Sequence, residues 1–170
     1  MITIFSEEAL PDHTAPRLCE EALAQATARF AVPCTDVVFV DCKGRMVLTK
    51  RRHAAAQGWW WMGGALSAGL TITENIGKLM QREIGMMPEG VTFLEPIHHV
   101  WADCRERPGA RRDDIILLHY VQVPEEFIVR IKLDPEEYDI QAGLMRFDGT
   151  QEDLRPILYY VHGVIQKRLA

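Results

Sequence analysis

The chain has 170 residues, 48% of them hydrophobic and 25% charged, and 24 acidic residues against 19 basic ones give a formal net charge of −5. This length fits one domain, or one domain with a short arm, and a core of that size needs no disulfide or structural metal. The acidic balance argues against nucleic-acid and membrane-surface binding, which both need basic patches, and no apolar run approaches the ~20 residues of a membrane span.

The N-terminus and the cysteines predict a cytoplasmic protein. The N-terminal sequence MITIFSEEALPDH is acidic where a signal peptide would be basic and then apolar. None of the four cysteines has CxxC or other metal-ligand spacing, so we expect reduced, partly buried thiols. These residues are Cys19, Cys34, Cys42 and Cys104.

Periodicity predicts a helix followed by a hairpin. The sequence PRLCEEALAQATARF (16–30) brings its apolar residues near one face of a helix, with Pro16 in a first-turn position. The β-branched run TDVVFVD (35–41) and the run RMVLTKR (45–51) are typical of two strands. Gly44 lies in the turn that would join them into a β-hairpin.

A glycine-punctuated loop and a second helix follow. The loop, residues 54–69, contains the sequence QGWWWMGG. Thr71 or Thr73 would cap a helix that runs to about Ile84, and Gly85 fits the position after its end. Apolar residues recur at near-helical spacing along this segment, which predicts one buried face.

The C-terminal half predicts strands and a last helix. Three strand-like runs cover 91–102, 115–123 and 126–133, and the charged segment 103–114 is expected to be an exposed loop. The final helix, 152–169, carries an apolar stripe. This order of elements predicts an α+β or mixed-sheet sandwich and not a strict βαβ repeat.

The most informative stretch is KRRHAAAQGWWWMGGALSAGLTITENIGKLMQREIGM, from Lys50 to Met86. It resembles the Nudix hydrolases, whose box is written G-x5-E-x7-R-E-U-x-E-E-x-G-U, where U is a bulky aliphatic residue. With the first box glycine at Gly64, the end of the box is matched by Glu83, Gly85 and Met86. Three glutamate positions of the box carry other residues: Leu70, Leu79 and Arg82.

The carboxylates missing from the box affect how many metal ions the site is able to bind. In an ordinary Nudix site, carboxylates on successive turns of the box helix collect divalent cations that bridge a pyrophosphate. Leu79 and Glu83 are four apart and share a helix face, so this helix presents one carboxylate there. Leu79 cannot ligate Mg²⁺ and Arg82 would repel it, which argues against a several-metal attack on phosphorus.

One branch of the family, the GDP-mannose mannosyl hydrolases, is similar to this chain despite the lost carboxylates. The shared pattern is Lys50-Arg51, the run AQGWWW (56–61), Gly63-Gly64, Leu79 and Glu83. That branch cleaves at the sugar C1, with one Mg²⁺ stabilising the departing nucleoside diphosphate. The resemblance, over about 36–147, implies a Nudix-like α/β/α sandwich with a mixed sheet between helices.

The resemblance also implies an organisation and a set of site residues. We expect a Nudix-like domain over 33–170 after an N-terminal helical arm, 1–32, which is a possible contact in a homodimer. A single Mg²⁺ ion, rather than several, would be held by the Gly63 carbonyl, Glu83 and Gln141. The catalytic residues would be Asp36, Arg51, Lys78 and Tyr120. The substrate-binding residues would be Arg51, Trp59, Trp60 and Tyr120, because aromatic faces suit a base or a sugar.

Two departures weaken the case for turnover. The general-base histidine of the branch is replaced by Ala142, and the arginine after Gly-Gly is replaced by Ala65. Loss of a general base removes a factor of about 10²–10⁴ in rate. Asp36 or a histidine would have to activate water instead, and the candidate histidines are His98, His99 and His119.

Three functions stay open from the sequence. The first is an Mg²⁺-dependent hydrolase of a nucleoside diphosphate-sugar of the GDP-mannose type, releasing sugar and nucleoside diphosphate. The second is a catalytically impaired Nudix-like domain that binds a nucleotide or nucleotide-sugar as a sensor or interaction module. The third is pyrophosphate hydrolysis with carboxylates from outside the box, such as Asp103, Asp113 or Asp114.

Overall fold

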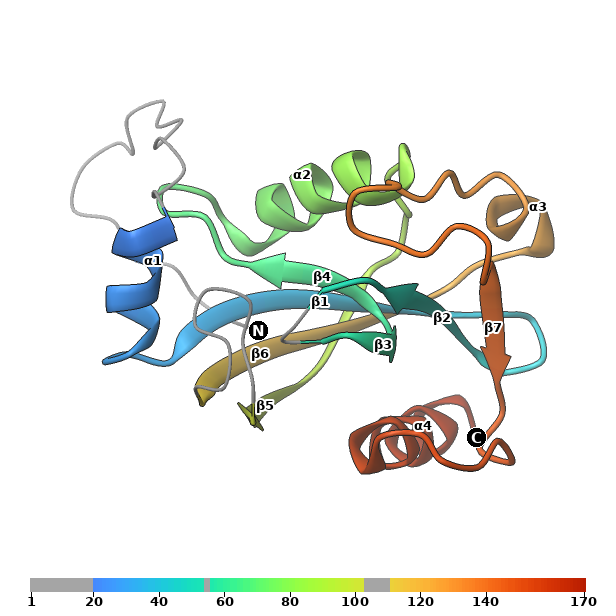
Figure 1. The fold of residues 1–170 in the computed structure, drawn as a ribbon. Helices are drawn as coiled ribbons and strands as arrows, with labels where there is room; N and C mark the ends of the chain where they lie inside the picture. The colour runs from blue at the N-terminus through green and yellow to red at the C-terminus, as the bar shows by residue number, and fades with distance from the viewer. Residues whose placement is uncertain (1–19, 54–55, 103–110) are drawn as a thin grey trace.

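The computed structural model of the chain describes residues 20–53, 56–102 and 111–170. Its helices lie on both sides of a seven-stranded mixed sheet (Figure 1). The elements in chain order are α1 (Glu20–Thr27), β1 (Val32–Val40), β2 (Met46–Arg51), β3 (Gly58–Trp60), β4 (Met62–Ala65), α2 (Ile72–Ile84), β5 (Thr92–Trp101), β6 (Arg112–Gln122), α3 (Glu125–Ile128), β7 (Leu144–Phe147) and α4 (Pro156–Leu169).

The central strand of the sheet divides its pairing between two partners. The strand order is β3-β2-β1-β6-β5, and β1 and β6 are parallel while the other pairs are antiparallel. The end of β1 pairs with β2, where Phe39 lies opposite Val47. Its first half pairs instead with β4, where Asp36 lies opposite Gly63. The sheet therefore forks between β2 and β4, and the candidate site lies at this fork.

The two faces of the sheet bury separate core clusters. Helix α4 covers one face and α2 the other (Figure 1). The α4-side core includes Val38, Leu48, Ile116 and Leu158, and the α2-side core includes Val37, Met62, Met80 and Val121. This arrangement confirms the predicted α/β/α sandwich. In the described residues, no helix is long and apolar enough to cross a membrane.

Helix α2 forms because its sequence supplies both caps and a buried stripe. The Thr71 side chain accepts from the backbone N–H of Glu74, and the Glu74 carboxylate accepts from the backbone N–H of Thr71, which makes a capping box. Gly85 ends the helix in the left-handed conformation, with φ of 73°. Ile76 and Met80, one turn apart, are buried against the sheet. The predicted span of this helix is confirmed.

Three local predictions differ from the structure. The run 126–133 is not a strand: Pro124 precedes the single turn of α3, and the apolar residues after it pack into the α2-side core. The alternation of those residues does not distinguish a strand from a compact turn. The predicted loop 54–69 contains the short strands β3 and β4. The first helix is described from Glu20 only, because residues 16–19 lie outside the described residues.

Two of the four cysteines can be placed. Cys34 is buried and Cys42 is exposed, and both are free thiols, as the sequence predicted. Cys19 and Cys104 lie outside the described residues.

The turn that joins β1 to β2 is held by the carboxylate of Asp41, which is 1% exposed. Its Oδ1 accepts from the backbone N–H groups of Lys43 at 2.9 Å and Arg45 at 3.0 Å, and its Oδ2 accepts from Arg45 Nε at 2.8 Å. Burial alone would raise the pKa of Asp41, but these hydrogen bonds and the Arg45 charge hold it below its usual value. The ionised carboxylate therefore stabilises the folded chain above the pKa of the unfolded state.

We expect this contribution to be lost as the pH falls from about 4 through the lower pKa of the folded state. Asp41→Asn should therefore lose less stability than the unmodified chain on acidification, in urea unfolding between about pH 6 and pH 3. Glu152→Gln, which removes an exposed carboxylate, is the matched control and should keep the original pH dependence. An unchanged pH dependence in Asp41→Asn would show that Asp41 does not stabilise the turn.

Candidate functional site at the sheet fork

The one carboxylate that the box retains, Glu83, is fully buried in the last turn of α2. Arg82 Nη2 donates to its Oε1 at 2.7 Å. Three groups donate to its Oε2: the backbone N–H of Gly63 at 3.2 Å, Arg51 Nη2 at 3.4 Å and the hydroxyl of Tyr138. Both carboxylate oxygens are thus already occupied by protein donors.

Arg51 is the cation of the site and is partly buried, with 15% of its side chain exposed. Its Nη2 donates to the Gly63 carbonyl at 2.6 Å and lies 3.2 Å from the Tyr138 hydroxyl, besides contacting Glu83. Burial alone would lower the pKa of Arg51, but the interactions with Tyr138 and Glu83 raise it above the usual value. The neighbouring Arg52 follows the end of β2 and is exposed, and its Nη1 donates to the Pro135 carbonyl at 2.7 Å.

Tyr138 reaches the site on a segment that closes the C-terminal end of α2. The backbone N–H of Lys132 donates to the Ile84 carbonyl at 3.3 Å, and that of Asp134 to the Glu83 carbonyl at 3.0 Å. Burial raises the pKa of Tyr138 well above its usual value, so the hydroxyl stays protonated and donates a hydrogen bond to the Glu83 carboxylate. No motif in the sequence pointed to Tyr138, because it lies far outside the box and its role depends on how this segment folds back.

A second buried carboxyl, Asp36, lies beside the fork on β1. Trp61 Nε1 donates to its Oδ2 at 2.6 Å. Burial raises the pKa of Asp36 to about 7, although the Trp61 hydrogen bond and the Arg51 charge act to lower it. The backbone of Gly63 passes so close that a Cβ there would lie 2.3 Å from Asp36 Oδ1. A glycine is therefore required at this position.

The residues at the fork do not fit a divalent metal ion. Two of the three expected ligands, the Gly63 carbonyl and Glu83, both contact the Arg51 guanidinium. The third, Gln141, is exposed and hydrogen-bonds to neither. Across the three described ranges, no group of three or more His, Cys, Asp and Glu side chains could hold a metal. Mg²⁺ needs several oxygen ligands in near-octahedral geometry, which this set does not supply.

The two remaining residues of the expected catalytic set, Lys78 and Tyr120, have different placements. Lys78 is exposed on α2, with its Nζ 3.4 Å from Ser67 Oγ. Tyr120 on β6 packs against the α4-side core, whereas Arg51 and Glu83 lie on the α2 side. The prediction that groups Tyr120 with Arg51 is therefore wrong, because alternation along β6 turns this ring to the other face of the sheet.

The predicted aromatic platform is mostly core. Trp60 is 2% exposed and packs against Trp61 and Trp101, with ring centroids 4.1 and 4.9 Å apart. The guanidinium of Arg155 lies over both the Trp60 and the Trp101 rings. Trp60 is thus unable to stack on a ligand, which corrects the prediction. Trp59 is half-buried and keeps part of its surface open.

The three candidate histidines are engaged elsewhere. His98 Nε2 lies 3.3 Å from the Asp113 carboxylate, and His99 packs within the tryptophan cluster. His119 is buried, and its Nδ1 lies 2.9 Å from the Leu117 carbonyl. None of them forms a hydrogen bond to the buried ion pair within the described part of the chain.

The carboxylates proposed from outside the box are not grouped with Glu83. Asp113 pairs with Arg111 at 2.8 Å and Asp114 with Arg112 at 2.7 Å, at the start of β6. Asp103 lies outside the described residues. The positions of Asp113 and Asp114 give no support to pyrophosphate hydrolysis by carboxylates from outside the box.

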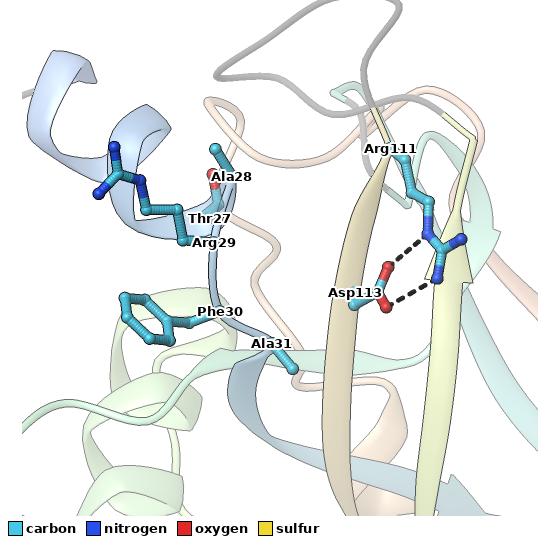
Figure 2. Close-up of a pocket in the computed structure, with 7 residues that line it drawn as sticks. All are labelled: Thr27, Ala28, Arg29, Phe30, Ala31, Arg111 and Asp113. Carbon is cyan, nitrogen blue, oxygen red and sulfur yellow. Dashed lines mark hydrogen bonds and ion pairs between the residues drawn. The ribbon is translucent and has the colours of Figure 1, made fainter.

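A separate pocket of about 370 Å³ lies between the α1–β1 connection and the start of β6 (Figure 2). Arg111 and Asp113 form an ion pair at one side of it, and Phe30 lies at the other (Figure 2). Its lining residues are Thr27, Ala28, Arg29, Phe30, Ala31, Arg111 and Asp113. None of the residues expected in the active site lines this pocket.

Comparison with known proteins identifies the fold. No family model and no curated protein matches the chain. A MutT protein from Methanosarcina mazei Go1 superposes with a TM-score of 0.62 at 12% identity, covering 82% of this chain and 95% of that one. The NUDIX domain of Shewanella oneidensis NrtR, in complex with ADP ribose, has a TM-score of 0.60 at 13% identity, covering 88% and 97%. A C. elegans Ap4A hydrolase has a TM-score of 0.56 at 13% identity, covering 82% and 98%. The chain has the Nudix fold.

Proposed function

We propose that this Nudix-fold domain binds a nucleotide or nucleotide-sugar without metal-dependent hydrolysis, as a sensor or interaction module. The observation that carries the proposal is the position of Arg51, whose Nη2 contacts both the Gly63 carbonyl and Glu83. These are two of the three groups that a catalytic metal would need. The ADP ribose complex of the NrtR domain supports the ligand class, because it is a nucleotide-sugar on the same fold.

The chain keeps groups suited to such a ligand. Lys78 and Arg82 are exposed and lie four apart on α2, so both cations share one helix face. Trp59 is half-buried but packs against the α4-side core, so it is not grouped with these cations. The ligand would thus be recognised by its phosphates.

A paired binding and turnover assay tests this function. Calorimetric titration of the full chain with nucleoside mono- and diphosphates and nucleotide-sugars should show binding of at least one of them. The same compounds, incubated with the chain and Mg²⁺, should release neither free sugar nor nucleoside monophosphate. Release of either product at a rate abolished by Glu83→Gln would contradict the proposal.

A second candidate is hydrolysis of a GDP-mannose-type nucleotide-sugar at the sugar C1, and Asp36 favours it. A carboxyl with a pKa of about 7 is able to accept a proton from water near neutral pH. Asp36→Asn keeps an acceptor for Trp61 but removes the base, so release of free sugar should fall by about 10²–10⁴. Release that is undetectable in the unmodified chain, or equal in the two proteins, excludes this candidate.

Homodimerisation through the N-terminal arm, residues 1–32, is also a proposal from the resemblance. Light scattering on the full chain measures it directly. A mass of two chains supports the homodimer, and a mass of one chain at micromolar concentration contradicts it.

A further inference from the structure

We propose that the Arg51 guanidinium is the resident cation of the fork and that Arg51 and Arg82 hold a phosphate-type anion directly, with no divalent ion. This inference rests on the proposed function, because the anion is the phosphate portion of the nucleotide ligand. It assigns Arg82, which stands at a box glutamate position, a direct contact with that phosphate beside Arg51.

The first step is the position of the positive charge. Arg51 Nη2 lies 2.6 Å from the Gly63 carbonyl on β4 and 3.4 Å from Glu83 Oε2 on α2. It therefore contacts the two groups, on β4 and α2, that were expected to ligate a metal. A guanidinium stays protonated at every relevant pH and does not dissociate from the chain. The site thus holds a fixed cation without a cofactor.

The second step is the local charge balance. Glu83 is paired with two guanidinium groups, those of Arg51 and Arg82, so this carboxylate does not neutralise both. Lys78 adds a third cation one turn before Arg82 on α2. Asp36 and Glu137 also act on the Arg51 charge, so these three cations lie among three carboxylates and the local charge is close to balanced. The attraction of an anion therefore comes from the guanidinium hydrogen-bond donors and not from a net positive charge.

The third step is the supply of free donors. Arg51 uses Nη2 for its protein contacts, its Nε is buried with no hydrogen-bond partner, and its Nη1 makes no hydrogen bond within the described residues. The Arg82 side chain is 51% exposed and uses only Nη2, toward Glu83. Two guanidinium groups thus keep unused N–H donors. The planar arrangement of N–H donors in a guanidinium group matches the oxygens of a phosphate group.

A metal-free titration tests the inference with inorganic pyrophosphate as the probe. We expect pyrophosphate to bind the full chain in EDTA, and we expect added Mg²⁺ not to strengthen the binding. Arg82→Gln should weaken it at least about tenfold, since a charge-assisted hydrogen bond is lost. Arg168→Gln, which removes an exposed arginine from α4 on the other side of the sheet, is the matched control and should leave the affinity unchanged.

Each alternative result has a distinct meaning. Pyrophosphate binding that requires Mg²⁺, or equal affinities in Arg82→Gln and Arg168→Gln, overturns the inference. Nucleotide binding that is unaffected by Arg82→Gln also overturns it, but leaves the proposed function intact. Pyrophosphate binding in EDTA, weakened by Arg82→Gln, with no binding of any nucleotide, supports the inference and contradicts the proposed function. Thermal unfolding of both variants, expected to be cooperative, shows that they are folded; Arg82→Gln should unfold at a lower temperature than the unmodified chain because Glu83 loses one guanidinium partner.

Discussion

Replacement of Arg51 with methionine should lower the free energy of unfolding by about 3–5 kcal/mol, the cost of removing one partner from a buried ion pair. Methionine fills much of the same space but donates no hydrogen bond. Glu83, which is fully buried, would lose one of its two guanidinium partners, and the Gly63 carbonyl would lose its donor. The fork would also lose its fixed positive charge.

Equilibrium unfolding in urea measures this effect, with Arg168→Met as the control. Arg168 is an exposed arginine of α4, so its replacement should change stability by less than about 0.5 kcal/mol. The double variant Arg51→Met/Glu83→Leu removes both charges and should recover part of the loss, because a buried pair can be replaced by apolar residues at little cost. A loss of unfolding free energy under 1 kcal/mol, close to the range of ordinary surface substitutions, would mean that Arg51 does not hold the fork together.

The Gly63→Ala substitution should cost roughly 2–5 kcal/mol, combining backbone strain with overpacking. Gly63 has a φ of +144°, a conformation that residues with a side chain rarely adopt. An added Cβ would also lie 2.3 Å from Asp36 Oδ1 and 2.6 Å from Asp36 Cα. The Cα belongs to β1, so the clash is not relieved by a side-chain rotation.

The adjacent glycine provides a matched control in the same loop. A Cβ at Gly64 would meet only Leu79 Cδ2, at 3.5 Å, which is an ordinary van der Waals contact. Gly64→Ala should therefore change stability by less than about 1 kcal/mol, since it also reduces the freedom of the unfolded chain. Equal costs for the two substitutions in urea unfolding would show that the close approach of β4 to Asp36 is not a constraint.

The layered architecture was predictable from the sequence because its signals are local. Helix α2 carries a capping residue, an apolar stripe and a terminal glycine, and each acts within a few residues of chain. The run 126–133 was not predictable in the same way. Its apolar residues suit either a strand or a turn packed on the core, and only the contacts with α2 decide between them.

The sequence predicts which carboxylates the candidate site lacks, but not which side chains meet there. Alignment with the box shows that Leu79 and Arg82 replace carboxylates, which needs no structure. That Arg51 lies between Gly63 and Glu83 depends on the fork of β1 between β2 and β4, which joins residues far apart in the chain. Tyr138 reaches the same carboxylate only because its segment closes the end of α2.

Tyr120 and Trp60, both named from the resemblance, illustrate the same limit. A motif fixes a residue type and a position, but alternation and bulges fix which face of the sheet the ring occupies. Tyr120 and Trp60 both pack into the α4-side core, whereas the buried ion pair lies on the α2 side. Residue roles carried over from a motif therefore depend on the register of each strand.

The most direct test measures Mn²⁺ binding to the full chain by electron paramagnetic resonance, which detects the signal of the free ion. Because Arg51 already occupies the Gly63 carbonyl and Glu83, the unmodified chain should give the same free-ion signal as buffer up to about millimolar Mn²⁺. One Mn²⁺ bound per chain, and lost in Glu83→Gln, would contradict the claim that a guanidinium stands in the place of the metal.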